Sequence, residues 1–535
     1  MREWWRSLRV TYLTVDPRSL GLFRVVFGLV LFSDLARRWA ELDFWYTNSG
    51  LLPNHTLLWR PPAPRMFSLF FGLSTPGEAQ VGFILCAFVY AMFLLGYRTR
   101  LAHVLALVAR VSLNTRLAVL ENGGDMVMDL LCLLTLPLPL GTRFSLDAVR
   151  APRTEEALEA RQRPVVSIAV LGLILQFATI YYFNAASKSG TAWRDGTAVH
   201  YALHQDRLVT WVGVWLREHL SLPVLKVMTR SVLMTEWLGF VLIITPIARP
   251  QARLLAVCLM PLLHLGFAFG LNLGGFSPAM MAFYPLLLTS EHWDALTRRF
   301  GARVRGLSSK VESLACRFVA PAPAVTARQD PVWRWLIEGA TVLVLIAITT
   351  EVLNDNAPVP KALRVHQPDW ARAVIDYPRI LQGWRMFASE PSRTDAMIYV
   401  DATTATGAHV DPYNEVASDQ PFPKGDVVPT HLGQSQFFVM YTERIPNVNY
   451  AVYRQAFSEW LLAYPQRTGR AQDCLLRYEV YYVADKSPPP GSGAAAPEPL
   501  ERQRFMTYTA PSDSSCRPIK ASASGPSTTS VAGND

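Results

Sequence analysis

The stretch VVSIAVLGLILQFATIYYFNAA fills residues 165–186 and contains no Lys, Arg, Asp or Glu. A helix needs about 20 apolar residues to cross the hydrocarbon core of a bilayer, so this stretch predicts a transmembrane helix. Similar stretches occur elsewhere along the chain, at 20–38, 79–97, 101–120, 126–141, 231–248, 252–272, 277–290 and 333–353. Soluble helical proteins do not combine so many long, nearly uncharged runs. The sequence therefore predicts an all-α polytopic membrane bundle with about nine transmembrane helices.

The composition agrees with this fold class. Of the 535 residues, 50% are hydrophobic and 17% are charged, whereas soluble domains carry about 25% charged residues. The net charge of +9 comes from 51 Lys and Arg against 42 Asp and Glu. With the N-terminus inside, the cytoplasmic loops receive most of the Lys and Arg, as the positive-inside rule requires. We expect an N-in/C-out protein of a bacterial inner (plasma) membrane, with lipids around it and no nucleic-acid partner.

The pattern changes after residue 354, where Pro and polar residues become frequent. The alternation in RYEVYYV indicates a strand with one buried face, and VYRQAFSEWLLAYP indicates an amphipathic helix. Three runs are β-rich, at 396–402, 435–444 and 474–485. Together they predict a small α+β domain outside the cytoplasm, followed by a Pro/Gly/Ala/Ser/Thr-rich tail that we expect to be disordered.

The expected organisation has six parts. They are a cytoplasmic interfacial segment (1–19), a transmembrane domain (20–295), a basic cytoplasmic loop (296–332), a final transmembrane helix (333–353), the extracytoplasmic α+β domain (354–486) and the disordered tail (487–535). Cys474 and Cys516 both fall outside, where a disulfide can form, although Cys516 lies in the tail. The chain contains no CxxC, HExxH, P-loop or GxSxG motif, so we expect no metal site.

Several ionisable residues fall within or beside the predicted spans, where each costs on the order of 2.5–3.5 kcal/mol. One interpretation is a set of buried ion pairs that fix helix packing, for example Glu236 with Arg24 or Arg110. The other is a polar chamber with a functional role, and His264 fits either interpretation. The residues that we assign to a polar intramembrane network are Arg24, Arg110, Asp125 and Glu236.

The segment QFATIYYFNAASKSGTAWRDGTAVHYAL, at 176–203, leads from an apolar helix to Lys188 at the predicted outer membrane boundary. Lys188 can extend its ammonium group to the interface, within a belt of Tyr and Trp side chains. Alternatively, its aromatic neighbours partly desolvate it, which disfavours the ammonium form and yields a neutral amine base. The spacing alone leaves both interpretations open.

YYFNAASKSGTAWRDGTA resembles the segment that carries the catalytic lysine of vitamin K-dependent γ-glutamyl carboxylases. In that family the lysine stands five residues before a tryptophan, which a glycine soon follows, as Lys188, Trp193 and Gly196 do here. The chain is also similar, over roughly 20–295, to the wider group of horizontally transferred transmembrane (HTTM) domain proteins. The stretches that carry this similarity are LFRVVFGLVLFSDLARRW, DFWYTNSGLLP, ENGGDMVMDLLCLL, RFSLDA, MTEWLGFVLIITP and PLLHLGFAFGLNLGGFSPAMMAFYPLLL. LQGWRMFASEP (381–391) is similar to a segment that often follows the domain in bacterial members.

The resemblance implies a reactive chamber that opens to the extracytoplasmic side, with Lys188 as the base that deprotonates a vitamin K hydroquinone. Oxygen then converts the quinol into a strong base that removes a γ-proton from a peptide glutamate, and carbon dioxide adds. The quinone and a peptide or protein substrate are thus the expected cofactor and partner. We expect the ring site to be lined by Tyr182, Phe183, Trp193, His200 and His264. Where the carboxylase has a histidine that assists the lysine, this chain has Gly124, so the aid is absent or comes from Asp125, His200 or His264.

Three functions compete at this point. The first is a quinone-dependent carboxylase or oxidase that uses Lys188 as general base. The second is a non-catalytic membrane module that anchors or assembles a partner through the C-terminal domain. The third, a transporter, is disfavoured because the predicted spans show no inverted repeat.

Overall fold

Among the residues that the structure describes, six helices are long and apolar enough to cross a membrane, so the chain is a multi-pass membrane protein. They are α2 (Pro17–Trp39), α5 (Pro76–Leu95), α10 (Ile168–Ser187), α14 (Leu222–Ile244), α15 (Arg249–Gly270) and α18 (Pro331–Asp355). This computed structural model describes residues 2–152, 154–301, 331–418, 435–492, 500–512 and 514–517. Most of the predicted loop 296–332 and the end of the predicted tail lie outside these residues.

The other three predicted spans are helical but short or charged. They correspond to α6 (Thr99–Arg116), α7 (Gly123–Leu134) and α16 (Phe276–Phe283), which continues as the 3-10 helix η2 (Tyr284–Leu287). The total of nine crossings therefore remains a prediction, as does the orientation.

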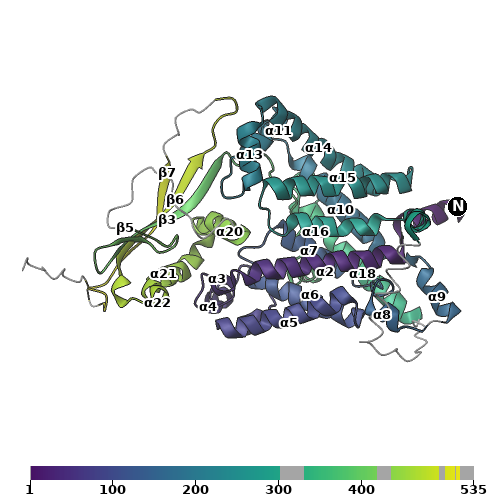
Figure 1. Cartoon of the computed structure of the whole chain (residues 1–535), viewed down its shortest axis with the longest axis horizontal. Helices are drawn as coiled ribbons and strands as arrows, with labels where there is room; N and C mark the ends of the chain where they lie inside the picture. Colours follow the sequence, from purple (N-terminus) through teal and green to yellow (C-terminus); the bar gives the residue numbers. More distant parts are fainter. Residues whose placement is uncertain are drawn as a thin grey trace, which may run out of the picture. The chain divides into compact units, whose positions relative to one another are not determined.

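Shorter helices connect and flank the long ones (Figure 1). They are α1 (Arg2–Tyr12), α3 (Leu42–Trp45), α4 (Asn54–Trp59), η1 (Leu69–Gly72), α8 (Leu146–Arg150), α9 (Glu155–Gln162), α11 (Thr191–Arg194), α12 (Ala198–Leu203), α13 (Trp211–His219), η3 (Lys361–Leu363) and α19 (Asp369–Asp376).

Local signals fix where the long helices begin and end. α2 begins after Asp16, whose side chain accepts a hydrogen bond from the Arg18 backbone N–H, and it has Pro17 in its first turn. α5 begins with a capping box between Thr75 and Glu78 and ends at Gly96, which adopts the left-handed conformation with φ 68°. These signals set the register in which the apolar faces pack.

The chain enters and leaves the bundle at opposite ends of α10. The strand β1 (Thr14–Val15) pairs antiparallel with β2 (Val165–Val166), just before α10 begins. Beyond the other end of α10, the Gly190 N–H donates to the Ser389 carbonyl at 3.0 Å, and within its last turn Asn184 Oδ1 accepts from the Met386 N–H at 2.9 Å. Residues 14–15 and 386–389 therefore lie at opposite ends of α10.

The chain divides into two compact units, which we describe separately. The first contains residues 1–395, 434–441 and 487–496, and the second contains the remainder. Residues 354–395, which we expected in the C-terminal domain, thus belong to the helical unit. The reason is local packing, because α19 packs against α18 and residues 386–390 bond to the end of α10 and to α11.

The second unit is built on a five-stranded sheet with the order β5-β4-β3-β6-β7. The strands are β3 (Thr394–Thr404), β4 (His409–Asp411), β5 (Val416–Ser418), β6 (Leu475–Lys486) and β7 (Glu501–Thr509). The expected strands at 396–402 and 474–485 are confirmed, and Tyr478 and Val480 alternate inward as the pattern predicts. A register shift between Val480 and Tyr481 then changes the phase, so that Val483 is the next deeply buried side chain.

Helical elements lie between β5 and β6. They are α20 (Gln436–Arg444), η4 (Val448–Tyr453), α21 (Arg454–Leu462), α22 (Tyr464–Thr468) and η5 (Ala471–Asp473). The predicted amphipathic helix is confirmed by α21, whereas the prediction of a strand at 435–444 is wrong, because that stretch forms α20. Phe438 and Tyr441 are spaced for one helical face, and both rings pack on Trp45, at centroid distances of 4.8 and 5.5 Å.

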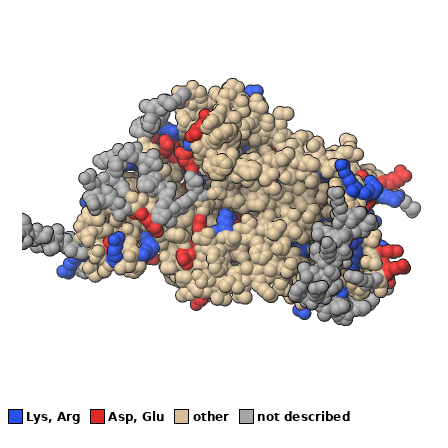
Figure 2. Space-filling model, in the orientation of Figure 1, with Lys and Arg blue, Asp and Glu red and all other residues tan. Residues whose placement is uncertain are grey.

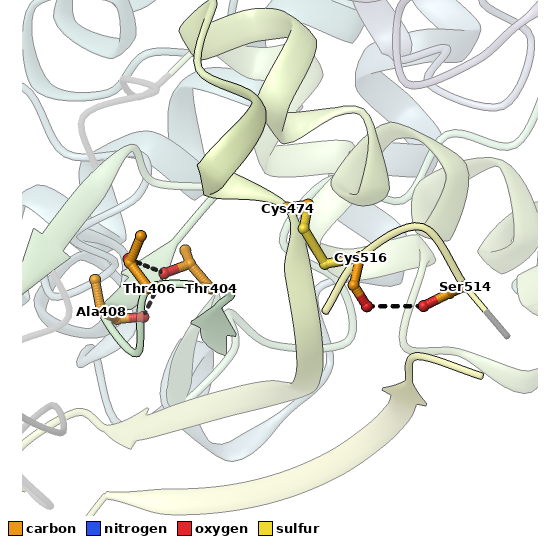
Figure 3. Close-up of a disulfide and its surroundings, with 6 residues drawn as sticks. All are labelled: Thr404, Thr406, Ala408, Cys474, Ser514 and Cys516. Carbon is orange, nitrogen blue, oxygen red and sulfur yellow. Dashed lines mark hydrogen bonds between the residues drawn. A yellow bond between two sulfur atoms is a disulfide. The ribbon is translucent and has the colours of Figure 1, made fainter. Parts of the chain in front are cut away.

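The prediction of a disordered tail from residue 487 is wrong for its middle part, where β7 pairs antiparallel with β6. Just beyond β7, Cys516 forms a disulfide with Cys474 at the start of β6 (Figure 3). The pairing that the sequence left open is therefore present. The disulfide ties the chain just after β7 to the sheet. The Pro-, Gly-, Ala- and Ser-rich composition of the tail did not indicate this link.

Candidate functional site

Lys188 lies where α10 ends, and its side chain turns into the helical unit. The residue is 7% exposed, and its Nζ donates to both carboxylate oxygens of Glu236 in α14, at 2.6 and 2.5 Å. Glu236 is 5% exposed. Lys188 is thus shielded from solvent, as the second interpretation requires, with a carboxylate at its ammonium group, and the role of a neutral base stays a prediction.

Trp193 in α11 covers the ammonium group. Lys188 Nζ stands 5.0 Å from the centroid of the indole ring, which is cation–π distance. The indole Nε1 donates to the Phe387 carbonyl at 2.9 Å, which fixes the plane of the ring. Val232, Leu233 and Phe387 pack around the cluster that contains Trp193. One ion pair therefore faces a wall of aromatic and aliphatic side chains.

The segment 381–391 completes this wall. Glu390 accepts hydrogen bonds from the Ala192 N–H and the Thr191 hydroxyl, each at 3.0 Å. The Glu390 carboxylate and the backbone bonds of 386–389 hold α11 against the end of α10. The similarity of 381–391 to a segment that often follows the transmembrane domain in bacterial members drew attention to this stretch. It assigned no role to Phe387 or Glu390.

Tyr182 and Phe183 are neighbours in α10, and their described contacts are with other rings. Tyr182 is 36% exposed and packs on the rings of Trp237 and Phe240 of α14, at centroid distances of 5.6 and 5.2 Å. Phe183 packs on Tyr182 at 5.0 Å. None of the ring contacts described for these two residues involves Lys188.

His200 and His264 lie apart from each other. His200 Nε2 is 2.8 Å from the Pro488 carbonyl, and its ring is tilted against that of His204, with the centroids 4.2 Å apart. His264 is buried, and its Nε2 is 2.6 Å from Tyr181 Oη, which also bonds to the hydroxyl of Tyr284. His264 Nδ1 has no partner among the described residues. The histidine is thus held in a buried tyrosine pair, as expected for a core residue.

The predicted polar network divides into three places. Arg110 and Asp125 are together, 2.7 Å apart, and the same buried cluster contains Asp34, Arg38 and Asp129. Arg110 contacts Asp34 at 3.2 Å and Asp129 at 3.1 Å, so its guanidinium joins α2, α6 and α7.

Arg24 and Glu236 are elsewhere, so the suggested pairs of Glu236 with Arg24 or Arg110 are wrong. Arg24 belongs to α2, and its guanidinium lies at the C-terminal end of α5. There it donates to the carbonyls of Phe93 and Leu94 and to that of Phe144. Cations are stabilised at a helix C-terminus by its unpaired carbonyls. Glu236 instead contacts Lys188 at the end of α10, one of the helices against which α14 packs.

Gly124 lies at a close contact between two backbone segments. A Cβ atom on Gly124 would stand 2.5 Å from the Phe276 backbone nitrogen and 2.7 Å from the Gly275 carbonyl carbon. Backbone atoms cannot move aside as a flexible side chain does. Position 124 therefore has no room for a side chain unless the backbone at 275–276 shifts.

Lys188 lines neither of the two cavities described here, both of which lie in the helical unit. The smaller has a volume of about 320 Å³ and lies between α13 and the loop at 271–274. The larger, about 1510 Å³, lies at the other end of α10.

Comparison with known proteins supplies a family. The HTTM domain model matches residues 12–293, more than half of the chain. The uncharacterized protein YitO of Bacillus subtilis (strain 168) is 24% identical over 283 residues, which is 47% of this chain and 88% of that protein. No solved structure matches the chain.

Proposed function

The chain belongs to the HTTM domain family, and we propose that it is a membrane enzyme that deprotonates a reduced quinone, as the vitamin K-dependent γ-glutamyl carboxylases do. The observation that carries the proposal is the buried ion pair of Lys188 and Glu236 beneath Trp193. As a carboxylase, the enzyme would use the deprotonated quinol to carboxylate a peptide glutamate, with carbon dioxide as co-substrate.

The energetics of the ion pair support a chemical role. Burying an ion costs several kcal/mol even after relaxation, and apolar residues of similar volume often give equal or better stability. An ion pair that served only packing would therefore add no more folding stability at the end of a helix than apolar residues would. Buried, charge-coupled groups beside an apolar surface are typical of catalytic sites.

The side chains beside Lys188 suit a hydroquinone in kind, although neither of the two cavities described above reaches Lys188. Trp193 and Phe387 provide flat apolar surface, and Lys188 Nζ is the one amine beside it in the described site. When bound, a deprotonated hydroquinone supplies the electrons for reaction with oxygen. The remaining steps that we assign belong to the side chains.

Glu236 and Lys188 can exchange one proton within their hydrogen bond. With the proton on the Glu236 carboxylate, Lys188 Nζ has a free lone pair and can accept a proton from a quinol hydroxyl. The resulting ammonium donates a hydrogen bond to the Glu236 carboxyl group, which still carries its proton and is neutral, and the Trp193 ring stabilises the positive charge. Glu390 and the Phe387 carbonyl position α11 and the indole for this step.

We place the Lys188 end of the bundle on the extracytoplasmic side of a bacterial inner membrane. The opposite end carries the arginines that the positive-inside rule assigns to the cytoplasm. The Cys474–Cys516 disulfide supports an oxidising compartment for the C-terminal domain.

The test compares Lys188→Arg with Lys226→Arg in full-length protein reconstituted in nanodiscs. Oxygen uptake and incorporation of labelled carbon dioxide into a glutamate-containing peptide are measured with vitamin K hydroquinone and menaquinol. A general base contributes about 10²–10⁴-fold, and a guanidinium cannot replace it, so Lys188→Arg should lose at least 100-fold. Lys226 is a lysine of α14 outside the site, so Lys226→Arg should keep full turnover. Equal turnover in both variants would refute the role of Lys188.

A non-catalytic membrane module is the second candidate, and two observations favour it. Gly124 leaves no space for the assisting histidine, and Glu236 already neutralises Lys188. If the chain is such a module, the wild-type protein folds and its C-terminal domain assembles with a partner, but it shows no quinol-dependent oxygen uptake.

A further inference from the structure

A groove of about 1510 Å³ opens at the end of the helical unit where α10 begins. Its walls come from the start of α6, the segment 133–142, residues 160–167 and the first half of α18, with Arg9 of α1 beside them. It lies a full helix length from Lys188, which is at the other end of α10, so it is separate from the candidate site.

The depth of the groove matches one leaflet. Along α18 the lining residues run from Trp333 to Val344, and they recur with the spacing of one helix face. Eleven steps of about 1.5 Å give a length of about 17 Å, and half of a hydrocarbon core is about 15 Å. The groove therefore spans the depth that one set of acyl chains occupies.

The lining is apolar along the walls and basic at the helix ends. The apolar lining includes Ile337 and Val344 of α18 and Leu101 and Val104 of α6, while Arg98, Arg100 and Arg334 lie near the ends of the same two helices. On the face drawn in Figure 2, uncharged residues cover most of the helical unit, and charged residues gather at the end where α1 and α9 lie.

The two carboxylates that line the groove are already bonded to the backbone. Asp147 accepts from the Arg98 and Thr99 N–H groups at 2.9 and 2.7 Å. Glu338 accepts from the Ile168 N–H at 2.8 Å. Among the described residues, Arg9, Arg98 and Arg100 have no carboxylate partner, and all three are exposed. The groove thus offers uncompensated guanidinium groups to an anion.

We propose that the groove binds an anionic phospholipid from the adjacent leaflet. The phosphate of the headgroup pairs with Arg98, Arg100 and Arg334, and the acyl chains lie along the lining face of α18. Basic pockets between transmembrane helices bind such headgroups. A free phosphate would use only the arginines and leave the leaflet-deep apolar wall empty, so a lipid accounts for both parts of the lining.

Native mass spectrometry of the full chain, released from nanodiscs of phosphatidylglycerol and phosphatidylcholine, tests the proposal. The wild-type protein should retain phosphatidylglycerol in preference to phosphatidylcholine. Arg98→Gln with Arg100→Gln should weaken this retention by about 25-fold, because one arginine near an anionic headgroup is worth about fivefold. The control, Arg298→Gln with Arg299→Gln, removes two exposed arginines that do not line the groove and should retain lipid as the wild type does.

A second pair of variants tests the apolar wall without changing charge. Ala340 lines the groove, whereas Leu343 is a 53% exposed residue of the same helix that does not. Ala340→Trp should displace the retained lipid, and Leu343→Trp should not. Retention without preference for the anionic lipid, or equal loss in a test variant and its control, would overturn the proposal.

Discussion

Glu236 is the residue on which the charge of Lys188 depends. Glu236→Gln leaves the buried ammonium without its counterion, and removing one partner of a buried pair costs about 3–5 kcal/mol. We expect a clear fall in the thermal unfolding temperature of the full chain in nanodiscs. The double variant Lys188→Met with Glu236→Gln removes both charges and should recover most of that loss.

The double variant also separates stability from chemistry. It should remain inactive with quinol although it folds, because it has no amine at the site. An unfolding temperature for Glu236→Gln equal to that of the wild type would show that the pair is not formed in the membrane.

Gly124 provides a second residue-scale prediction, with Gly123 as its matched control. An alanine Cβ at 124 would meet backbone at 2.5 Å, whereas at 123 the nearest atom is Met386 Sδ at 3.5 Å. Gly124→Ala should destabilise the chain by about 1–3 kcal/mol through overpacking, and Gly123→Ala should have little effect. Thermal unfolding and yield of folded protein measure the difference, and equal values for the two variants would contradict the close contact.

At the scale of elements, Arg110 joins α2, α6 and α7 through three carboxylates. Arg110→Met should leave Asp34, Asp125 and Asp129 undercompensated and cost more than about 3 kcal/mol. The control is Arg116→Met in the same helix, because Arg116 donates to the Leu52 carbonyl and is far less coupled to carboxylates. Urea unfolding in mild detergent should rank Arg110→Met as the less stable variant, and the reverse order would contradict the network.

The C-terminal sheet depends on the disulfide that holds β7. Closing a loop of 42 residues stabilises a fold by about 4 kcal/mol on the chain-entropy account. Cys516→Ser should therefore make the segment 500–512 sensitive to protease while the helical unit stays intact. The control is Cys258→Ser, which replaces a free cysteine of α15, and equal protease sensitivity of the two variants would argue against the bridge.

The sequence could predict elements whose signal is local. Runs such as 165–186 and the alternation in β6 depend on the residues of one element, and both predictions are confirmed. α20 could not be predicted, because SQFFVMYTER suits a strand by composition and becomes helical through the packing of Phe438 and Tyr441 on Trp45. β7 was missed because β6 and Cys474, which hold it in place, both lie outside the segment 487–535 whose composition suggested disorder.

The residues of the candidate site could likewise be predicted only where they lie close together in sequence. Lys188 and Trp193 were found because they share one segment, and Phe387 was missed because it lies about 200 residues away. Glu236 was identified as an ionisable residue in a span, but its partner depends on which helix α14 packs against. Pairing across a bundle is a property of the fold, and no spacing in the sequence encodes it.

At the scale of the whole molecule, the account predicts that residues on the two ends of the bundle face different compartments. Lys361→Cys and Arg298→Cys each place a thiol at an exposed position outside the long helices. In intact cells, a membrane-impermeant maleimide should label residue 361 and leave residue 298 unlabelled until the membrane is opened. Labelling of residue 298 alone would reverse the proposed orientation.

The central claim is that the Lys188–Glu236 pair takes a proton from a reduced quinone, and anaerobic absorption spectroscopy tests it most directly. Without oxygen the later steps stop, so a bound hydroquinone that loses its proton accumulates as the monoanion, with its shifted ultraviolet band. The account predicts this band for the wild-type chain and for Lys226→Arg, and its absence for Lys188→Arg at the same bound quinol. A band of equal strength in Lys188→Arg, or a wild-type chain that binds quinol and leaves it protonated, would contradict the claim.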